Sequence, residues 1–394
     1  MSTHDLYTIP AELSTWDVEA AGAARFTWEY DDGRDRMLAL YQKGKDKQWD
    51  SVKRIDWDLE VDPYNVLGIP DTTIAIYDTP LWDRMDEKQR QDVRLHSAAW
   101  QFSQFLHGEQ GAMICSARIV ESVPDLDSKF YAATQTMDEA RHAETYARFL
   151  QEKVGLAYPI NEHLKALLDS TLSDSRWDMP YLGMQVLIEG LALAAFGVMR
   201  DITTKPLPKQ ILAYVMQDEA RHVAFGRMAL RDYYSNLSES ELREREDFVI
   251  EGCYLMRDRL RGRETWETIG LSKSEVAQAM EAVDQSEYLR LFRSLLFSRI
   301  VPCVKDIGLW SPVSSRRTPT WACWTWPPEP GRPDAAGRGH RRQARRRTLR
   351  RRGGRAPRGG RRDHLPRRRV LTRVPPPDPG PGISRQTSHV RRRR

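Results

Sequence analysis

The five-residue motif Asp-Glu-Ala-Arg-His occurs twice in this chain, at positions 138–142 and 218–222. Within each copy the glutamate and the histidine are three residues apart, so an α-helix would place both side chains on one face. Glu139 and His142 can therefore bind one centre together, as can Glu219 and His222. Carboxylate oxygen and imidazole nitrogen form a hard ligand set, which suits iron or manganese better than copper or a thiolate-bound zinc.

A lone glutamate precedes each copy of the motif, in a stretch of small or apolar residues. Glu109 lies in GEQGAMICSA and Glu189 lies in QVLIEGLALAAFG, each thirty residues before the glutamate of the following motif. Burying a carboxylate in the middle of such a helix costs several kcal/mol unless the group is paired or bound to a metal. Two divalent cations would neutralise four carboxylates, so we expect two metal ions.

The spacing also predicts how the helices are arranged. A turn at Val123 and Pro124 lies about midway between Glu109 and Glu139, and an α-helix rises about 1.5 Å per residue. Two antiparallel helices would thus bring both glutamates to one depth, and a turn over 203–208 does the same for the second pair. Packing the two hairpins together predicts one site of six donors: Glu109, Glu139, His142, Glu189, Glu219 and His222.

Charged residues next to these ligands are expected to hold the ligand side chains in place. Asp138 and Asp218 directly precede two of the glutamates, and each can accept the free N–H of a ligand histidine on the other hairpin, which fixes the ring. Arg141 and Arg221 could pair with these aspartates. The competing interpretation is a set of surface positions on amphipathic helices. A single Glu-x-x-His pair would support it, but the duplication and the equal spacing favour the metal site.

The remaining pattern predicts an all-α protein, because no convincing run of alternating strand residues is present. We expect helices over 34–48, 88–123, 128–154, 162–173, 180–201, 209–234 and 273–297. Ser238 and Glu241 form a capping box that would start another helix. Three regions follow: an N-terminal extension over 1–80 that packs on the bundle, the helical bundle over 81–300, and a tail over 313–394.

The tail differs from the body in charge. Residues 313–394 contain 25 Arg, no Lys and 4 acidic residues, a net charge of +21, which leaves −15 for residues 1–312. This Arg-, Gly- and Pro-rich composition predicts disorder. A frameshift in a GC-rich gene would produce it, and the functional alternative is an arm that binds nucleic acid.

Targeting signals are not evident. The first residues lack the apolar stretch of a secretory signal, and the most apolar run, 186–199, is too short to span a bilayer and carries Glu189. The four cysteines are widely spaced, which suits a reduced compartment. We therefore expect a cytoplasmic protein that is not in a membrane.

The six-donor pattern resembles the ferritin-like di-iron carboxylate superfamily, in which two helices each give a Glu and the other two each give a Glu-x-x-His. Within it, the DExRH form looks most like the hydroxylase subunit of bacterial multicomponent monooxygenases and the small subunit of ribonucleotide reductase. The resemblance implies a four-helix bundle with extra flanking helices, two iron ions (with manganese possible at one position), and dioxygen as co-substrate. It also implies an external electron donor, either a reductase or a ferredoxin, and a homodimer.

At several positions this chain differs from these families, and the differences help to decide which branch of the superfamily it resembles. In the reductase small subunit, a radical-forming tyrosine lies four residues after the first ligand histidine. That position is Tyr146 here, which is a candidate redox residue or an ordinary core tyrosine. The multicomponent hydroxylases have a threonine where this chain has Leu193. Arylamine N-oxygenases have an extra ligand histidine where this chain has Val215.

Small residues near the ligands leave two interpretations open. Ala112, Ala192, Gly197 and Gly226 could make room for an organic substrate, or they could allow close helix packing. Our main functional prediction is a monooxygenase or oxidase that uses dioxygen on a small organic molecule. The alternatives are a radical-storing subunit that acts through Tyr146 and an iron oxidation or storage protein.

Overall fold

The computed structural model describes residues 16–19, 22–30 and 33–310. Helices account for the regular structure of these residues, with no β-strand among them. The class is therefore all-α, as predicted, and the architecture is a ferritin-like helical bundle. The predicted basic tail over 313–394, and with it the question of a frameshift, lies outside the described residues.

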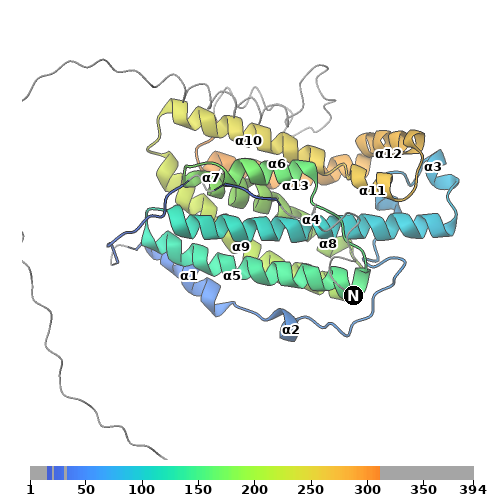
Figure 1. Cartoon of the computed structure of the whole chain (residues 1–394), viewed down its shortest axis with the longest axis horizontal. Helices are drawn as coiled ribbons and strands as arrows, with labels where there is room; N and C mark the ends of the chain where they lie inside the picture. Colours follow the sequence, from blue (N-terminus) through green and yellow to red (C-terminus); the bar gives the residue numbers. More distant parts are fainter. Residues whose placement is uncertain (1–15, 20–21, 31–32, 311–394) are drawn as a thin grey trace, which may run out of the picture. The chain divides into compact units, whose positions relative to one another are not determined.

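Two antiparallel hairpins form the centre of the bundle (Figure 1). In the first, α4 (Glu87–Ser122) packs along α5 (Leu126–Phe149), which a short π-helix, η4 (Leu150–Val154), extends. In the second, α8 (Glu189–Ile202) packs along α9 (Pro206–Tyr234). Each hairpin thus carries one lone glutamate and one copy of the motif.

Local chemistry explains where these helices begin and end. Asp86 and Gln89 form a reciprocal capping box at the start of α4, and the Asp125 side chain accepts from the Ser128 backbone N–H at the start of α5. Gly155 ends the second helix with a φ of 72°, a left-handed conformation that glycine adopts without strain. Pro206 starts α9, where its missing N–H removes no helical hydrogen bond.

The helix that leads to Glu189 differs from the prediction. It begins as α7 (Asp178–Pro180), passes through the π-helix η5 (Tyr181–Ile188), and becomes regular at α8. Together these segments run 25 residues from Asp178 to Ile202, which is long and apolar enough to span a membrane. Since 72% of its most apolar window is buried inside the protein, we interpret it as the core helix of the bundle.

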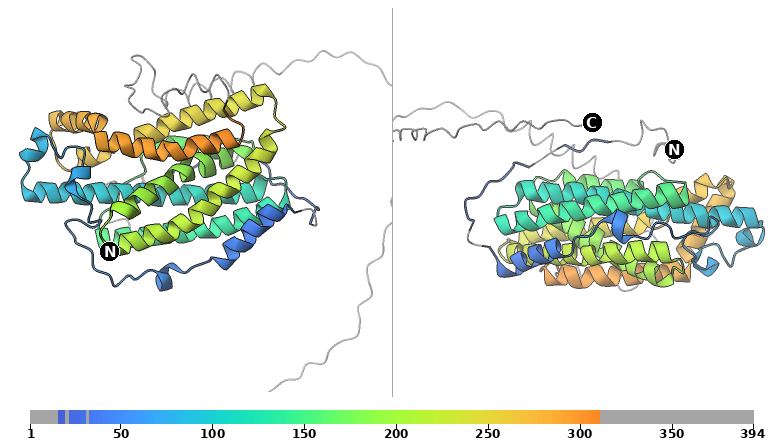
Figure 2. Two further views of the ribbon diagram at one scale, coloured as in Figure 1. Left: turned by 180° about the vertical axis from the view of Figure 1, so that it is seen from behind. Right: turned by 90° about the horizontal axis from the view of Figure 1, so that it is seen from below.

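Further helices flank the hairpins (Figure 2). They are α6 (Glu162–Leu172), α10 (Glu239–Arg259), α11 (Arg263–Thr268), α12 (Lys273–Gln285) and α13 (Glu287–Asp306). The single helix predicted over 273–297 is wrong, because it divides at Ser286. The Ser286 side chain caps the Leu289 backbone N–H, and α13 starts there as a new helix.

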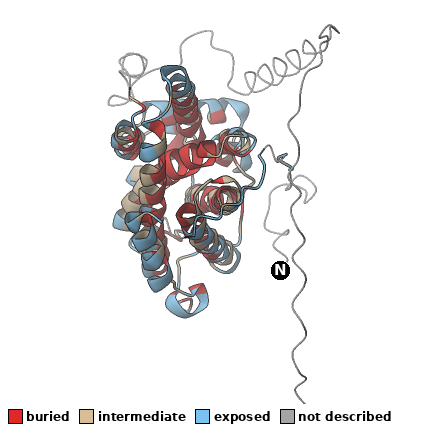
Figure 3. Cartoon of the chain, turned by 90° about the vertical axis from the view of Figure 1, so that its left-hand side faces the viewer, coloured by how far each residue is buried: buried red, intermediate tan, exposed pale blue. Residues whose placement is uncertain are grey.

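The N-terminal region packs against the opposite hairpin faces. It contains α1 (Asp35–Asp46), α2 (Ser51–Arg54), the 3₁₀ turn η3 (Asp71–Thr73) and α3 (Pro80–Asp83). Helix α1 contacts both α5 and α9. Figure 3 shows the buried residues gathered where the helices face one another and the exposed residues on their outer sides. The predicted ligands lie within this interior.

Candidate metal centre

The structure brings the six predicted donors together in the interior, where none is more than 5% exposed. Their donor atoms form two groups in which all atoms lie within 4.8 Å of one another. The first group contains Glu109, Glu139, His142 and Glu219, and the second contains Glu139, Glu189 and His222. Glu139 belongs to both groups, so it would contribute to both ion sites.

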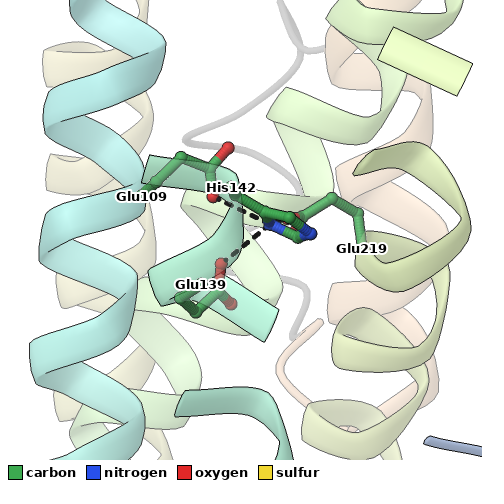
Figure 4. A group of neighbouring side chains, drawn as sticks. All are labelled: Glu109, Glu139, His142 and Glu219. Carbon is green, nitrogen blue, oxygen red and sulfur yellow. Dashed lines mark hydrogen bonds and ion pairs between the residues drawn. The ribbon is translucent and has the colours of Figure 1, made fainter. Parts of the chain in front are cut away.

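The first group centres on the Nδ1 atom of His142. This atom lies 3.3 Å from Glu109 Oε2, 3.2 Å from Glu139 Oε2 and 3.2 Å from Glu219 Oε1. Figure 4 shows these side chains converging from three helices, Glu109 on α4, Glu139 and His142 on α5, and Glu219 on α9. Three carboxylates around one imidazole nitrogen make a compact cation site.

The second group is arranged in the same way around His222 Nδ1. This atom lies 3.0 Å from Glu139 Oε1 and 3.6 Å from Glu219 Oε2. Glu189 completes the group from the start of α8. The two imidazole rings face each other across the carboxylates, with their centroids 6.0 Å apart.

A buried glutamine that the sequence analysis missed links two of the carboxylates. Gln135 Nε2 donates to Glu139 Oε1 at 2.9 Å and to Glu189 Oε1 at 2.8 Å. Gln135 precedes Glu139 by one helical turn and therefore shares its face. A polar residue one turn before a predicted ligand could have indicated this supporting role from the sequence. Gln135 holds carboxylates of both hairpins in a fixed relation.

The outer nitrogen of each histidine meets an aspartate of the opposite hairpin. His142 Nε2 lies 3.0 Å from Asp218 Oδ2, and His222 Nε2 lies 3.2 Å from Asp138 Oδ2. An N–H donated at Nε2 leaves the Nδ1 lone pair free to bind a cation. The aspartates thus set which nitrogen of each ring faces the carboxylates.

Two buried arginines pair with these two aspartates and complete a layer of charged residues behind the histidines. Arg141 donates to Asp138 and to Asp218, the latter at 2.8 Å, while Arg221 donates to Asp218 and, at 3.2 Å, to Asp138. Each guanidinium therefore joins the two hairpins. Removing one partner from a buried ion pair destabilises a protein by about 3–5 kcal/mol, so the network fixes the hairpins in one register.

The N-terminal region supplies two more contacts to the same layer, and the sequence analysis did not predict them. Trp49 Nε1 donates to Asp218 Oδ2 at 2.7 Å, and Gln48 Nε2 donates to Asp138 Oδ1 at 2.7 Å. The Trp49 ring also lies under the Arg141 guanidinium, 4.7 Å from its centroid. From the sequence we could predict only that the tryptophan-rich start of the chain packs on the bundle. Its particular contacts could not be predicted, because no periodic pattern aligns this region with the helices of the bundle.

The charges of the cluster explain its pKa values. Burial, followed by the charge of Glu219, raises the pKa of Glu109 and of Glu189 well above the usual range. Burial opposes a charge on His142 as well, but the hydrogen bonds that its ring donates to Asp218, Glu109 and Glu139 outweigh it and raise the pKa of His142. Without a cation, Glu109, Glu189 and His142 therefore hold their protons to a higher pH than usual.

The residues fit a pair of metal ions by a further observation. Among the described residues, Glu189 Oε2, both oxygens of Glu219 and His222 Nδ1 are buried without a hydrogen-bond partner. Unpaired buried carboxylate oxygens are costly, and all of these residues belong to the two donor groups. Cations bound there would satisfy them.

Tyr146 lies one turn after His142 and is completely buried. Its ring packs among Phe102, Phe105 and Phe196, with centroids 5.7–6.1 Å away. Its hydroxyl has no hydrogen-bond partner among the described residues. Burial and the nearby charge of Glu109 raise its pKa well above the usual value. This environment suits a neutral core tyrosine, and a redox role for Tyr146 stays a prediction.

A cavity of about 50 Å³ adjoins the cluster and is lined by Glu109, Glu189 and Glu219. Ala112 and Ala192 also line it, so these small residues make room beside the carboxylates. Gly226 does not, because a Cβ there would lie 2.5 Å from Gln185 Cβ, which makes it a close-packing position. The two interpretations of the small residues therefore hold at different positions.

Comparison with known proteins identifies a family. The family described as "P-aminobenzoate N-oxygenase AurF" matches residues 31–308. Among solved structures, an R2-like ligand-binding oxidase with a Mn/Fe cofactor is 16% identical (72% of this chain, 96% of that chain, TM-score 0.44). The dimanganese NrdF of Streptococcus sanguinis is 11% identical (73% and 93%, TM-score 0.48). No curated protein matches this chain.

The family match points to the N-oxygenase branch, although the sequence analysis noted that this chain lacks the extra histidine of arylamine N-oxygenases. Val215, where arylamine N-oxygenases have an extra histidine, is fully buried in an apolar cluster with Ile211 and Leu212. The match nevertheless spans both hairpins and most of the described residues. The chain therefore belongs to the p-aminobenzoate N-oxygenase AurF family, and it is a di-iron oxidoreductase that activates dioxygen.

Proposed function

We propose that the six buried donors bind two iron ions and that the enzyme uses them to oxygenate a small organic molecule. Oxidation of an amino nitrogen is the reaction that the family description names. The single observation that carries the proposal is the contact between the donor cluster and a cavity, since Glu109, Glu189 and Glu219 each line the space beside the site.

The ligand assignment follows the two donor groups. Glu109, Glu139, His142 and Glu219 would hold one ion, while Glu139, Glu189 and His222 would hold the other. Reduced iron, when bound, supplies electrons to dioxygen and so makes it reactive towards an organic substrate. Conversion of an amine to a hydroxylamine consumes one dioxygen, two electrons and two protons and releases one water, so the electrons must come from a second protein or cofactor.

The protein's own groups prepare the site for this reaction. Asp138 and Asp218 hold the two imidazoles with Nδ1 facing inward, and Gln135 orients Glu139 and Glu189. Four carboxylates in a buried cluster lower the charge of the iron pair to zero. The apolar lining around the cavity excludes bulk water, which protects reactive oxygen species from competing reactions.

The substrate class is less defined than the reaction. Apolar side chains, including Phe105, Phe196 and Leu191, form much of the cavity wall beside the carboxylates. Such a wall favours a flat or aromatic body. The missing histidine at Val215 leaves one ion with one ligand fewer than the arylamine N-oxygenases have, so an aromatic amine is a test substrate and not an assignment.

The assembly and location of the enzyme are also proposals. We propose a homodimer that receives electrons from a reductase or a ferredoxin in the cytoplasm. The di-iron chemistry supports an external donor, because the described residues of this chain contain no second cofactor-binding motif. Light scattering of the purified full chain would test the dimer, and oxygen uptake with purified ferredoxin and its reductase would test the donor.

Substrate-dependent oxygen uptake tests the proposed function. Full-length protein is loaded with Fe²⁺, supplied with electrons and mixed with p-aminobenzoate or other aromatic amines, and the product is identified by mass spectrometry with ¹⁸O₂. We expect one ¹⁸O atom in the first product and no turnover in Glu139→Ala. Oxygen uptake that ignores every organic compound, together with iron loading far beyond two per chain, would indicate an iron oxidation or storage protein instead.

A further inference from the structure

The hairpin of α4 and α5 exposes apolar side chains on its outer side. The two helices run side by side on the near side of the bundle in Figure 1. Ile114 on α4 is 42% exposed, while Phe130 and Met137 on α5 are 39% and 62% exposed. Surface helices usually carry charged or polar residues on the side that faces water. This outer side therefore departs from the pattern of a helix that faces only water.

The exposed positions of α5 form one uncharged stripe. Between Lys129 and Glu144 the exposed residues are Phe130, Ala133, Met137 and Ala140. They are three or four positions apart, so they share one face of the helix. The partner helix continues the stripe, because Ile114 and Ala117 are exposed on α4 at the depth of the same turns. The outer side of the hairpin is thus apolar across both helices.

The outer side is also large enough for a stable interface between proteins. The 24 residues of α5 extend over about 36 Å, and two adjacent helices are about 20 Å wide. The hairpin therefore offers roughly 700 Å² on this side, close to the roughly 800 Å² that a standard interface buries on each partner. Such interfaces have an apolar centre and a polar rim. Lys129 and Glu144 lie at the two ends of the stripe, where a rim is expected.

The charges at these two ends make the stripe complementary to itself. Met137 lies about midway between Lys129 and Glu144. A two-fold axis at Met137 would place α5 against an antiparallel copy of itself, in which the same patch contacts the same patch. Lys129 of each chain would then lie near the level of Glu144 of the other. The middle of the contact would bring no charge against a like charge.

The same features argue against a transient partner such as an electron donor. Transient complexes of redox proteins have small interfaces, and complementary charges steer their association. Homodimer interfaces are more apolar. The stripe from Phe130 to Ala140 has no charged residue at an exposed position over about 15 Å of helix. A second copy of this chain is therefore the partner that the stripe fits.

We propose that two copies of this chain pair through the outer sides of α4 and α5, with Met137 at the two-fold axis. This inference deepens the proposed homodimer by naming the surface that forms it. Glu109, Glu139 and His142 lie on the same two helices, so each copy would hold the ligand helices of the other from outside. The pairing itself depends on neither iron nor a substrate.

Sedimentation velocity of the purified full chain tests the interface. We expect the wild type to be a dimer at micromolar concentration. Met137→Lys would bring two like charges together at the axis, and we expect it to weaken the dimer at least a hundredfold. A wild type that is monomeric at tens of micromolar, or a Met137→Lys chain that dimerises as tightly as the wild type, would overturn the proposal.

Leu291→Lys is the matched control. Leu291 lies on α13 and is 59% exposed, close to the value for Met137. The same charge introduced there should leave the dimer intact, because α13 is not part of the proposed interface. Loss of the dimer in Leu291→Lys, with retention in Met137→Lys, would overturn the proposal by moving the interface to α13.

Opposite charges at one position test the symmetry of the pairing. Met137→Glu alone should be monomeric for the same reason as Met137→Lys. An equimolar mixture of the two variants should form a heterodimer, because position 137 of one chain faces position 137 of the other. This recovery would also show that both variants are folded. A mixture that stays monomeric would contradict the axis at Met137.

Disulfide cross-linking gives a readout that needs no disruptive charge. The cysteines of the described residues, Cys115, Cys253 and Cys303, are all buried, and oxidised wild type is the background. Oxidation of Met137→Cys should give a covalent dimer, and oxidation of Leu291→Cys should not. The reverse result would overturn the proposal. A dimer cross-linked through Met137→Cys in protein that consumes no oxygen with any organic compound would leave the interface standing and contradict the proposed function.

Discussion

At the scale of single residues, the candidate site is a buried cluster of charges that two bound cations would balance. The donor atoms of four buried carboxylates and two imidazoles form two groups, and within each group they lie within 4.8 Å of one another. Several of these donor atoms make no hydrogen bond within the described residues. The neighbours Asp138 and Asp218 fix the imidazoles from behind. The ligand roles therefore depend on the outer residues as well as on the donors.

We predict that Asp218→Asn weakens iron binding roughly tenfold to a hundredfold. The asparagine keeps the size of the side chain, but it removes the charge that faces His142 Nε2 at 3.0 Å. Competition with a coloured chelator measures the affinity. Asp232→Asn, on the outer face of the same helix with its side chain 62% exposed, is the control. Equal iron affinity in both variants would rule out the positioning role of Asp218.

Iron affinity should fall as the pH is lowered. The pKa values of His142, His222, Glu109 and Glu189 are all raised in the metal-free cluster, so these groups hold their protons to a higher pH than usual. Iron must displace those protons, and a lower pH favours their retention. Calorimetry in two buffers of different ionisation enthalpy counts the protons released. An affinity and heat that do not depend on pH or buffer would contradict the pKa directions.

The redox role of Tyr146 makes a separate prediction. If Tyr146 is oxidised, reduced iron-loaded protein exposed to oxygen should give a tyrosyl radical signal in electron paramagnetic resonance, and Tyr146→Phe should lose it. Tyr131 is another fully buried tyrosine near the cluster, so Tyr131→Phe is the matched control. A radical signal that survives in Tyr146→Phe would exclude Tyr146 as its source.

At the scale of elements, the sequence predicted the two hairpins well because their signals are local. Pro124, Gly155 and Pro206 mark turns, and the equal spacing of glutamates fixes the depth of each helix. The π-helix η5 was not predicted, since an extra residue per turn leaves no trace in an apolar run such as YLGMQVLI. The division at Ser286 was missed for a related reason, because apolar residues continue on both sides of it.

The N-terminal region makes the clearest prediction about an element. Trp49 donates its indole N–H to Asp218 and lies against Arg141. We expect Trp49→Phe to remove one hydrogen bond to the charged Asp218 carboxylate, which Arg141 and His142 still contact, and to lower the free energy of unfolding by roughly 1–3 kcal/mol. Urea denaturation measures the change.

The control for this prediction is another tryptophan of the same region. Trp28 is 89% exposed, so Trp28→Phe should leave the free energy of unfolding within about 0.5 kcal/mol of the wild type. Equal effects of the two substitutions would show that the N-terminal region does not stabilise the aspartate–arginine layer.

At the scale of the whole molecule, the sequence predicted the class of enzyme more fully than its specificity. Six residues in a repeated pattern were enough to predict a pair of metal ions, and the resemblance of that pattern to a known superfamily implied iron and oxygen chemistry. The cavity could not be predicted, because it depends on how α10 packs across the hairpins, and no motif records that packing. The branch within the superfamily also required the family match, since Val215 lacks the expected histidine.

The metal content of the purified, iron-supplied full chain tests the central claim most directly. With two ions held on six side chains, elemental analysis should find about two iron ions per chain. Glu139→Ala, which removes the carboxylate shared by both donor groups, should retain fewer than about one, while Glu152→Gln, a change at a partly exposed glutamate just after the same helix, should retain about two. A wild-type chain without bound transition metal, or a Glu139→Ala chain that keeps its full complement, would contradict the account.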